Sequence, residues 1–157
     1  MGLLAGLRVA VAGPGNAARV CGRVLADLGA AVSADAPGDG SALAAWLETG
    51  WTRADGDPDL VVVQGRPSEL RARGAHPDQL RDRHPRAAIV AIAPFGLTGP
   101  RAEDPATDLT LFAASGMMRL LTGQVDDVSE PPLRAVGRQS DVVAGLAAAC
   151  AGVHALL

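Results

Sequence analysis

"VAVAGPGNAARVCGRVLADLGAAV", residues Val9–Val32, decides the fold of this chain. A short apolar run leads into the turn Gly13-Pro14-Gly15, and apolar residues at helical spacing follow it. Gly29 stands where a helix commonly ends in a left-handed conformation. The pattern therefore predicts a strand, a glycine turn and a helix over Ala17–Leu28, which is the first unit of an α/β fold.

The same turn has the form of a dinucleotide-binding fingerprint. In such a site the glycine turn lets the backbone approach a pyrophosphate, which the free N–H groups at the start of the helix then bind. Asp35 lies where an acid would bind the ribose, roughly 20 residues beyond the glycines. Strand–glycine–helix turns also occur in α/β domains that bind no dinucleotide, so a nicotinamide-binding domain is one hypothesis among others.

Apolar runs alternate with helical patterns as far as Ala93. Strands are predicted at Leu7–Ala12, Ala31–Ala34, Leu60–Val63 and Ala87–Ala93, and helices at Ala17–Leu28, Ser41–Thr49 and Pro77–Arg83. This alternation predicts an α/β fold with a parallel, Rossmann-like sheet and helices on both faces. The polar segment Thr49–Pro58 is interpreted as a surface loop within a single domain over 1–157.

After Ala93 the chain becomes rich in Gly and Pro. Asp104 is predicted to cap a helix that has Pro105 in its first turn and ends at Ala114. A final helix follows the expected cap Ser140, and it is apolar nearly all round. Such a helix needs cover on all sides. We expect a homo-oligomer, or a complex with a chain that covers it, with this helix and Asp108–Gly116 at the interface; the alternative is complete packing against the chain's own sheet.

The composition excludes several functions. The chain has 157 residues, of which 48% are hydrophobic and 20% charged, and no apolar run is long enough to span a bilayer. Met1–Ala12 lacks the features of a signal peptide, so a cytoplasmic location is expected. A net charge of −3 and few aromatic residues argue against nucleic-acid binding. All 14 basic residues are Arg, which excludes Schiff-base chemistry on a Lys.

The cysteine and histidine residues and two of the methionines are assigned structural rather than catalytic roles. Cys21 and Cys150 lack the spacing of metal ligands and are predicted to be buried, inert thiols, and no metal site is expected. The remaining assignments are His76 and His84 at the surface, His154 in a partly buried or C-terminal turn, and Met117 and Met118 in the core.

Six blocks of sequence, taken in order, carry a family resemblance. They are CGRVLADLGA (21–30), GRPSELRARGAHPDQLRDRHPR (65–86), FGLTGP (95–100), DLTLFAASG (108–116), LTG (121–123) and PPLRAVGRQSDVVAG (131–145). Their order and spacing resemble the N-terminal part of the family III CoA-transferases, the CaiB/BaiF group. The resemblance implies a Rossmann-like domain that binds coenzyme A or acyl-CoA as a substrate. Asp141, which follows a Pro-Pro pair and precedes Gly145, matches the position of the family's catalytic Asp.

The resemblance implies a covalent mechanism. The Asp141 carboxylate would attack an acyl-CoA thioester to give a mixed anhydride, and the CoA thiolate would then form an aspartyl-CoA thioester. Arg66, Arg71 and Arg73 are candidates for binding the CoA phosphates, because they follow a strand whose end marks the ligand edge of a parallel sheet; a solvated helix face is the alternative. Gly96, Gly99 and Gly116 would let the backbone approach the thioester. NAD(P) binding becomes the weaker hypothesis, because the family accounts for the same turn.

The sequence also departs from the family. Ala17-Ala18-Arg19 replaces the usual Ala-Gly-Pro, and Ala34 and Ala36 stand where relatives carry Lys and Glu. A Lys/Arg-containing segment is absent between Gly50 and Asp57, and the sequence ends where the family continues into a second domain. These departures favour an alternative, a non-catalytic binding or assembly subunit. Thr107 occupies the catalytic His position of related racemases, so no exchange of an α-hydrogen is expected.

Overall fold

A computed structural model describes residues 2–52, 55–122, 129 and 135–157 of the chain. Four parallel strands form one sheet in the order β2-β1-β3-β4. Their bounds are β1 Arg8–Ala12, β2 Ala31–Ala34, β3 Leu60–Gln64 and β4 Ala88–Ile92. The predicted parallel sheet is confirmed, and each strand lies within one residue of its predicted ends. The Pro-Pro pair at 131–132 and Gly123 lie outside the described residues.

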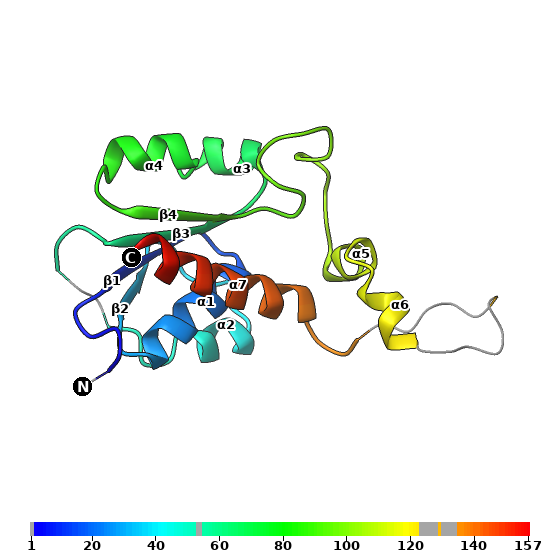
Figure 1. Ribbon diagram of the computed structural model, residues 1–157, viewed down its shortest axis with the longest axis horizontal. Helices are drawn as coiled ribbons and strands as arrows, with labels where there is room; N and C mark the ends of the chain where they lie inside the picture. The colour runs from blue at the N-terminus through cyan, green and yellow to red at the C-terminus, as the bar shows by residue number, and fades with distance from the viewer. Residues whose placement is uncertain (1, 53–54, 123–128, 130–134) are drawn as a thin grey trace.

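Helices cover both faces of the sheet (Figure 1). The elements α1 (Asn16–Asp27), α2 (Ala42–Leu47) and α7 (Gln139–Ala155) lie on one side, and α3 (Pro67–Ala72) and α4 (Pro77–Arg83) lie on the other. The short helices α5 (Asp108–Ala114) and α6 (Met117–Thr122) extend beyond the sheet as an arm. The helices α3 and α6 have no counterpart among the predicted elements.

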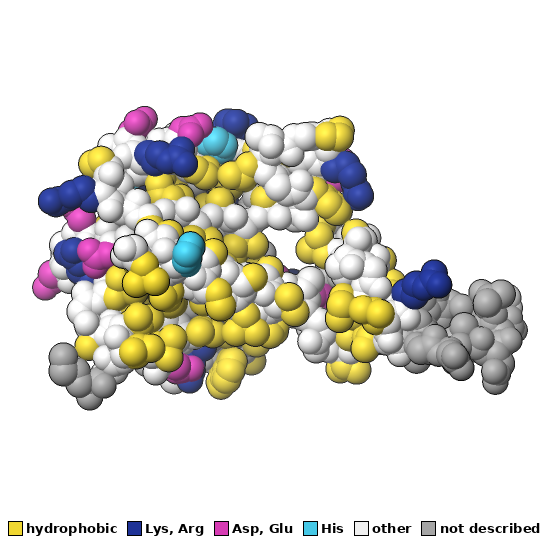
Figure 2. Space-filling view, viewed as in Figure 1, with side chains coloured by type: hydrophobic (Ala, Val, Ile, Leu, Met, Phe, Trp, Pro, Cys, Tyr) yellow, Lys and Arg dark blue, Asp and Glu magenta, His cyan; other side chains and the backbone are white. Residues whose placement is uncertain are grey.

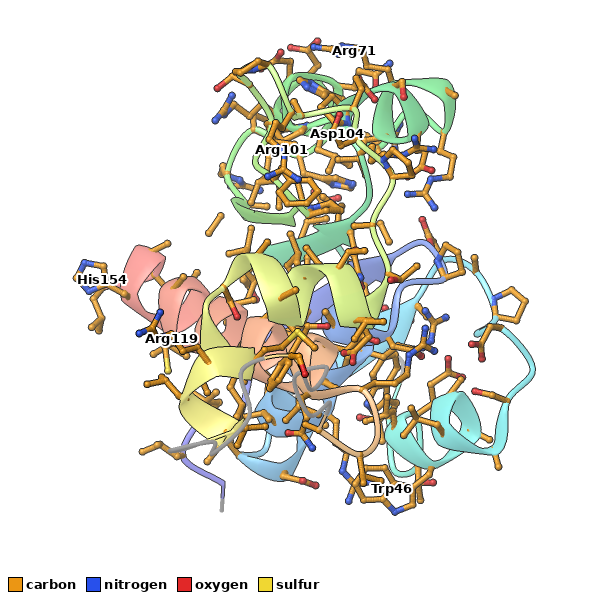
Figure 3. The ribbon with its side chains drawn as sticks, turned by 90° about the vertical axis from the view of Figure 1, so that its right-hand side faces the viewer. Trp46, Arg71, Arg101, Asp104, Arg119 and His154 are labelled. Atoms are coloured by element: carbon orange, nitrogen blue, oxygen red, sulfur yellow. The ribbon has the colours of Figure 1, made fainter. Side chains whose placement is uncertain are left out.

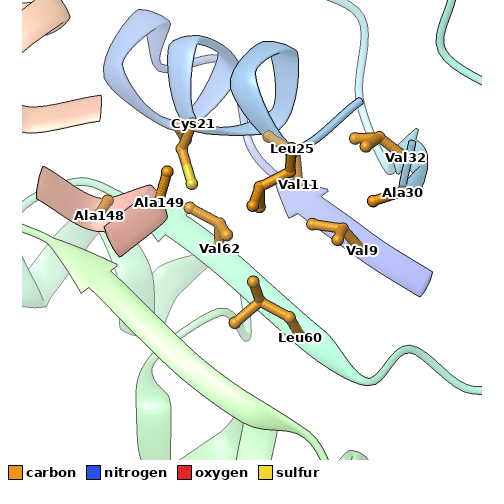
Figure 4. Close-up of a cluster of buried hydrophobic side chains, with 11 residues drawn as sticks. Val9, Val11, Cys21, Leu25, Ala30, Val32, Leu60, Val62, Ala148 and Ala149 are labelled. Carbon is orange, nitrogen blue, oxygen red and sulfur yellow. The ribbon is translucent and has the colours of Figure 1, made fainter. Parts of the chain in front are cut away.

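Strand β3 shows why the chain forms layers. Successive side chains of a strand point to opposite faces. Leu60 and Val62 therefore join the core beneath α1 and α7, whereas Val61 and Val63 join the core beneath α3 and α4. Figure 4 shows the first of these cores, where Cys21 and Leu25 of α1 meet Ala149 of α7 above the strands.

Helix α7 packs on α1 and on strand β3 through small residues. A Cβ added to Gly145 would lie 2.6 Å from the Ala17 carbonyl oxygen, and one added to Gly152 would lie 2.8 Å from the Leu60 side chain. The opposite side of α7 is open, with Val143 63% and Leu146 46% exposed. Complete packing of this helix against the chain's own sheet, the alternative considered above, is therefore wrong.

Two predicted helix starts are wrong because other side chains form the caps. Helix α5 begins at Asp108 rather than at Pro105, since the Thr107 hydroxyl accepts a hydrogen bond from the Thr110 N–H at 3.3 Å. Asp104 instead pairs with Arg101 at 3.0 Å. Helix α7 begins at Gln139, with Arg138 as its N-cap residue. Ser140 lies inside this first turn and its hydroxyl donates to Asp108.

Tertiary packing changes the burial of several side chains. His76 is buried rather than at the surface, because it caps α4 and its Nδ1 accepts from the Asp78 N–H at 3.5 Å. His84, also expected at the surface, is half-buried. Met117 is exposed and Met118 half-buried, since both lie on the arm rather than in the core.

The two cysteines differ. Burial raises the pKa of Cys21 to about 12, which agrees with an inert thiol, whereas Cys150 is exposed and its predicted burial is wrong. His154 is exposed in the last turn of α7 and points away from the body of the molecule (Figure 3). Across the described ranges, no helix has the length and apolar character that a membrane crossing requires.

Candidate active site

A cavity of about 1140 Å³ lies at the carboxyl ends of strands β3 and β4, beside the turn that follows β1. This is the edge at which parallel sheets bind ligands. The cavity is bounded by α3, by the loop after β4, by α5 and by the N-terminal half of α7. Figure 2 shows the molecule hollowed between its main body and the α5–α6 arm. Asp141, Arg66 and Arg73 all line this space.

Asp141 is held in the first turn of α7, with 17% of its side chain exposed. The Arg138 guanidinium contacts the Asp141 carboxylate at 3.0 Å and extends to Asp39 at 3.8 Å. Burial raises the pKa of Asp141 above its ordinary value, while Arg138 and a hydrogen bond from Gln64 act in the opposite direction. The structure thus presents a mostly buried carboxylate, paired with Arg138, to an open cavity.

Gln64 lies between Asp141 and the turn after β1. Its Oε1 accepts a hydrogen bond from the Ala18 N–H at 3.1 Å, and its amide lines the cavity with Asp141 and lowers the pKa of that carboxyl. The Ala18 N–H lies in the first turn of α1, so Gln64 occupies one of the donors that a bound phosphate would use there. Gln64 was not among the predicted site residues; its place at the carboxyl end of a buried strand was the available signal.

Asp108 joins α5 to the start of α7. Its Oδ1 accepts from the Ser140 N–H at 2.9 Å and from the Ser140 hydroxyl. The negative charge of Asp108 adds to the rise in the pKa of Asp141. Thr107 beside it is engaged in capping α5. The arm and the candidate nucleophile are therefore fastened together by the residue that begins α5.

The three candidate arginines have different surroundings. Arg66 is held by Glu69 at 2.6 Å and donates to the Glu103 carbonyl at 3.2 Å. Arg73 lies over the turn after β1, where a Cβ on Gly13 would be 2.8 Å from its Nη1, and it donates to the Gln64 carbonyl at 2.9 Å. Arg71 is exposed, does not line the cavity and lies at the outer edge of the molecule in Figure 3.

The three candidate glycines occupy turns next to the cavity rather than its wall. Gly96, Gly99 and Gly116 have φ angles of +86°, +101° and +79°, which L side chains rarely adopt. Their neighbours Phe95, Ser115 and Met117 do line the cavity. These glycines therefore set the paths of the loop after β4 and of the turn between α5 and α6.

The Gly13-Pro14-Gly15 turn is filled by the protein's own side chains. A Cβ on Gly15 would lie 2.2 Å from Gln64 Oε1. Asp35, the candidate ribose ligand, accepts a hydrogen bond from the Gly13 N–H at 2.8 Å. The groups expected to bind a dinucleotide thus bind one another.

Arg19 is a buried residue that the sequence analysis noted only as a departure from the family. Its side chain is 0% exposed; its Nε donates to Glu48 at 2.6 Å and its Nη1 to the Gly13 carbonyl at 2.8 Å. Its Nη2 donates to the Ala36 carbonyl at 2.9 Å. Arg19 therefore joins the turns after β1 and β2, and the turn after β1 lines the cavity. A charged residue within the apolar face of a predicted helix was the signal for it.

No cluster of three or more His, Cys, Asp or Glu side chains suited to a metal occurs among the residues that the structure describes.

The pKa of Asp141 predicts a dependence of stability on pH. Because its folded-state pKa is raised, Asp141 favours folding most at a pH below its unfolded-state pKa of about 3.9, and this contribution is lost as the pH rises through the folded-state pKa. Asp141→Asn should therefore raise the melting temperature at pH 7 by about 2 °C, and the gain should vanish near pH 3.5. Thermal unfolding across this range tests it. Asp104→Asn, outside the cavity, should give no gain; a D141N variant less stable than the wild type at pH 7 would contradict the expectation.

The amino-acid sequence has recognisable relatives. Residues 56–157 match CoA-transferase family III. The chain is 32% identical over 93 residues to succinyl-CoA:(R)-benzylsuccinate CoA-transferase subunit BbsE of Thauera aromatica. The aligned region covers 59% of this chain and 23% of that protein. It is 30% identical over 99 residues to a probable fatty acyl-CoA transferase, Rv3272, of Mycobacterium tuberculosis, covering 61% and 24%.

Solved structures share the fold. The chain matches the crystal structure of Rv3272 from M. tuberculosis with a TM-score of 0.76 and 27% identity, covering 99% of this chain and 50% of that one. It matches a CAIB/BAIF family protein from Brucella suis with a TM-score of 0.76, and the identity of 22% makes this a likeness of fold. The chain spans about half the length of these solved relatives, and about a quarter of the two curated ones.

Proposed function

Because this chain belongs to CoA-transferase family III, we propose that its cavity binds an acyl-CoA and that Asp141 carries out a covalent transfer of CoA between carboxylic acids. One observation carries the proposal. The Asp141 carboxylate is mostly buried in the cavity wall at the carboxyl edge of the sheet, where Arg138 contacts it at 3.0 Å.

The first half of the reaction transfers CoA to the protein. An oxygen of ionised Asp141 attacks the thioester carbonyl, the carbon–sulfur bond breaks, and a mixed anhydride and a CoA thiolate result. The thiolate then attacks the aspartyl carbonyl. The carbon–oxygen bond to the donor acid breaks, and this acid leaves as a carboxylate. Asp141 now carries CoA as a thioester.

The second half reverses these steps with a different acid. The incoming carboxylate attacks the aspartyl thioester, and the CoA thiolate leaves, so that a new mixed anhydride forms on Asp141. The thiolate then attacks the acyl carbonyl of this anhydride. The new acyl-CoA forms, and Asp141 is released as a carboxylate. No net proton is transferred. Arg138 and the amide of Gln64 favour the ionised form of Asp141, and the N-terminus of α7 favours negative charge at this position.

CoA recognition is proposed to involve the candidate arginines to different degrees. Arg73, which lies in the cavity beside the glycine turn, suits a phosphate of CoA. Arg66 lines the same cavity, but its ion pair with Glu69 has to open or to share the ligand. Arg71 lies outside the cavity, so it could bind only a part of CoA that extends beyond it. Gly96, Gly99 and Gly116 are proposed to place the loops against the thioester.

A binding or assembly subunit is the second candidate function. It is favoured by exposed apolar side chains on α6 and α7 outside the cavity lining, including Leu120 at 74% and Leu146 at 46%. Large apolar patches on a protein surface mark interaction sites. We propose that a second copy of the chain, or another polypeptide, covers this surface in either function.

Covalent labelling separates the two functions. The protein is incubated with a panel of acyl-CoAs, quenched in acid and digested, and the peptides are mapped by mass spectrometry. Transferase function predicts an acyl or CoA adduct on Asp141. An unmodified Asp141 with every acyl-CoA, together with association detected by light scattering, would favour the assembly subunit. Calorimetric titration with CoA and with NAD serves as the control, and tight binding of NAD alone would overturn the proposal.

A further inference from the structure

The cavity around Asp141 has a polar end and an apolar end. The charged lining residues among those described are Arg66, Glu69, Arg73 and Asp141, and all four lie on β3–α3 or at the start of α7. Arg66 and Glu69 neutralise each other at 2.6 Å. The rest of the wall, from the loop after β4 and from α5 and α6, presents the apolar side chains Ile92, Phe95, Leu111, Phe112 and Met117.

Helix α7 connects the two ends. Asp141, Ala144 and Ala147 all line the cavity, and Ala147 is exposed to it. The rise of 1.5 Å per residue places Ala147 about 9 Å along the helix axis from Asp141. Because both alanines are small, this face of α7 leaves room in the cavity for a ligand between the candidate nucleophile and the apolar wall.

The charges in this space discriminate between classes of acyl group. Arg73 is the described lining cation that has no carboxylate within ion-pair distance, and it lies at the polar end beside Gly13. A second carboxylate on the substrate would have to enter the apolar end, where no described lining residue is a cation. Arg101, which stacks on the Phe95 ring at 4.0 Å, is already paired with Asp104 at 3.0 Å, so the carboxylate would lose hydration there without gaining an unpaired cation. An alkyl or aryl chain would instead exchange water for apolar contacts.

We infer that the acyl group accepted by this cavity is an uncharged apolar chain that runs along α7 past Ala144 as far as Ala147, and that short or ω-carboxylated acyl groups are disfavoured. The inference rests on the proposed function, because it takes the apolar acyl chain to be attached to CoA. It goes further in naming the substrate class and the residues that set chain length.

The test uses S-alkyl-CoA thioethers, which Asp141 cannot cleave, so that binding is measured apart from chemistry. Calorimetric titration should give affinities that rise by about fourfold for each methylene buried between S-methyl-CoA and S-octyl-CoA. An S-(3-carboxypropyl) thioether should bind more weakly than its S-butyl counterpart. Ala147→Phe should weaken S-octyl-CoA binding by about tenfold or more and leave S-methyl-CoA within twofold. Ala151→Phe, on the same helix but outside the cavity lining, is the matched control and should change neither.

The outcomes distinguish the inference from the proposed function. Chain-length dependence that Ala147→Phe removes, without any adduct on Asp141, would support the inference and overturn covalent transfer. An adduct on Asp141 with equal affinity for all thioethers, or with preference for the carboxylated one, would overturn the inference and leave the transferase function standing. An equal effect of Ala147→Phe and Ala151→Phe would assign the apolar binding to the outer surface of α7 and overturn the inference. Absence of binding by every thioether, with Asp141 unmodified, would overturn both.

Discussion

Replacing Asp141 with Asn should lower the rate of CoA transfer by at least about 10³-fold, because the amide cannot form the anhydride on which both halves of the reaction depend. The loss should appear in the rate constant rather than as unfolding, since an uncharged side chain at this buried position relieves the cost of burying a charge. Arg138 and Gln64 would remain in place, so the cavity should keep its shape.

A degenerate exchange measures this rate without knowledge of the natural acceptor. An acyl-CoA is mixed with the ¹³C-labelled form of its own free acid, over a panel from acetyl to octanoyl, and the label entering the thioester is followed by mass spectrometry. Asp141→Ala guards against deamidation of the new Asn. Asp104→Asn, which replaces a half-buried Asp outside the cavity, should stay within about twofold of the wild type. Exchange by D141N at the wild-type rate would refute the role of this carboxylate.

Replacing Arg19 with Met should cost about 3 kcal/mol of folding stability. The change leaves the carbonyls of Gly13 and Ala36 without their donors and removes the buried partner of Glu48, whose own side chain is 31% exposed. In a domain of this size the melting temperature should fall by roughly 10 °C. Arg19→Lys should recover little of the loss, since an ammonium group cannot reach three acceptors in the geometry of a guanidinium.

Thermal and urea unfolding measure this loss. Arg81→Met is the matched control: its side chain is 67% exposed and pairs with Asp78 at 3.1 Å on the surface, so the cost should stay below about 1 kcal/mol. Similar losses for the two variants would show that the Arg19 network contributes no more than a surface ion pair.

The sequence by itself determined the α/β fold. Short apolar runs, alternating with helical patterns and closed by Gly or Pro, predicted all four strands, and Pro77–Arg83 was predicted to the residue. These features depend on neighbours within a few positions, because strand and helix periods are local properties of the chain. The family resemblance likewise singled out Asp141 from a pattern of spacing. Two helix starts were predicted wrongly, because the N-cap residues are Thr107 and Arg138 rather than the expected Asp104 and Ser140.

Only the tertiary structure decided which side chains form the site. Gln64 reaches Ala18 across 46 positions of the chain, and Arg19 reaches Glu48 across 29. Gln64 and Ala18 meet because β1 and β3 are parallel neighbours in the sheet, so the turns that follow the two strands lie at the same edge. The same packing separates three arginines that look equivalent in sequence: Arg66 is paired with Glu69, Arg71 lies outside the cavity, and Arg73 lies over Gly13. Local pattern sets where the chain turns, but burial and charge pairing depend on which distant segments meet there.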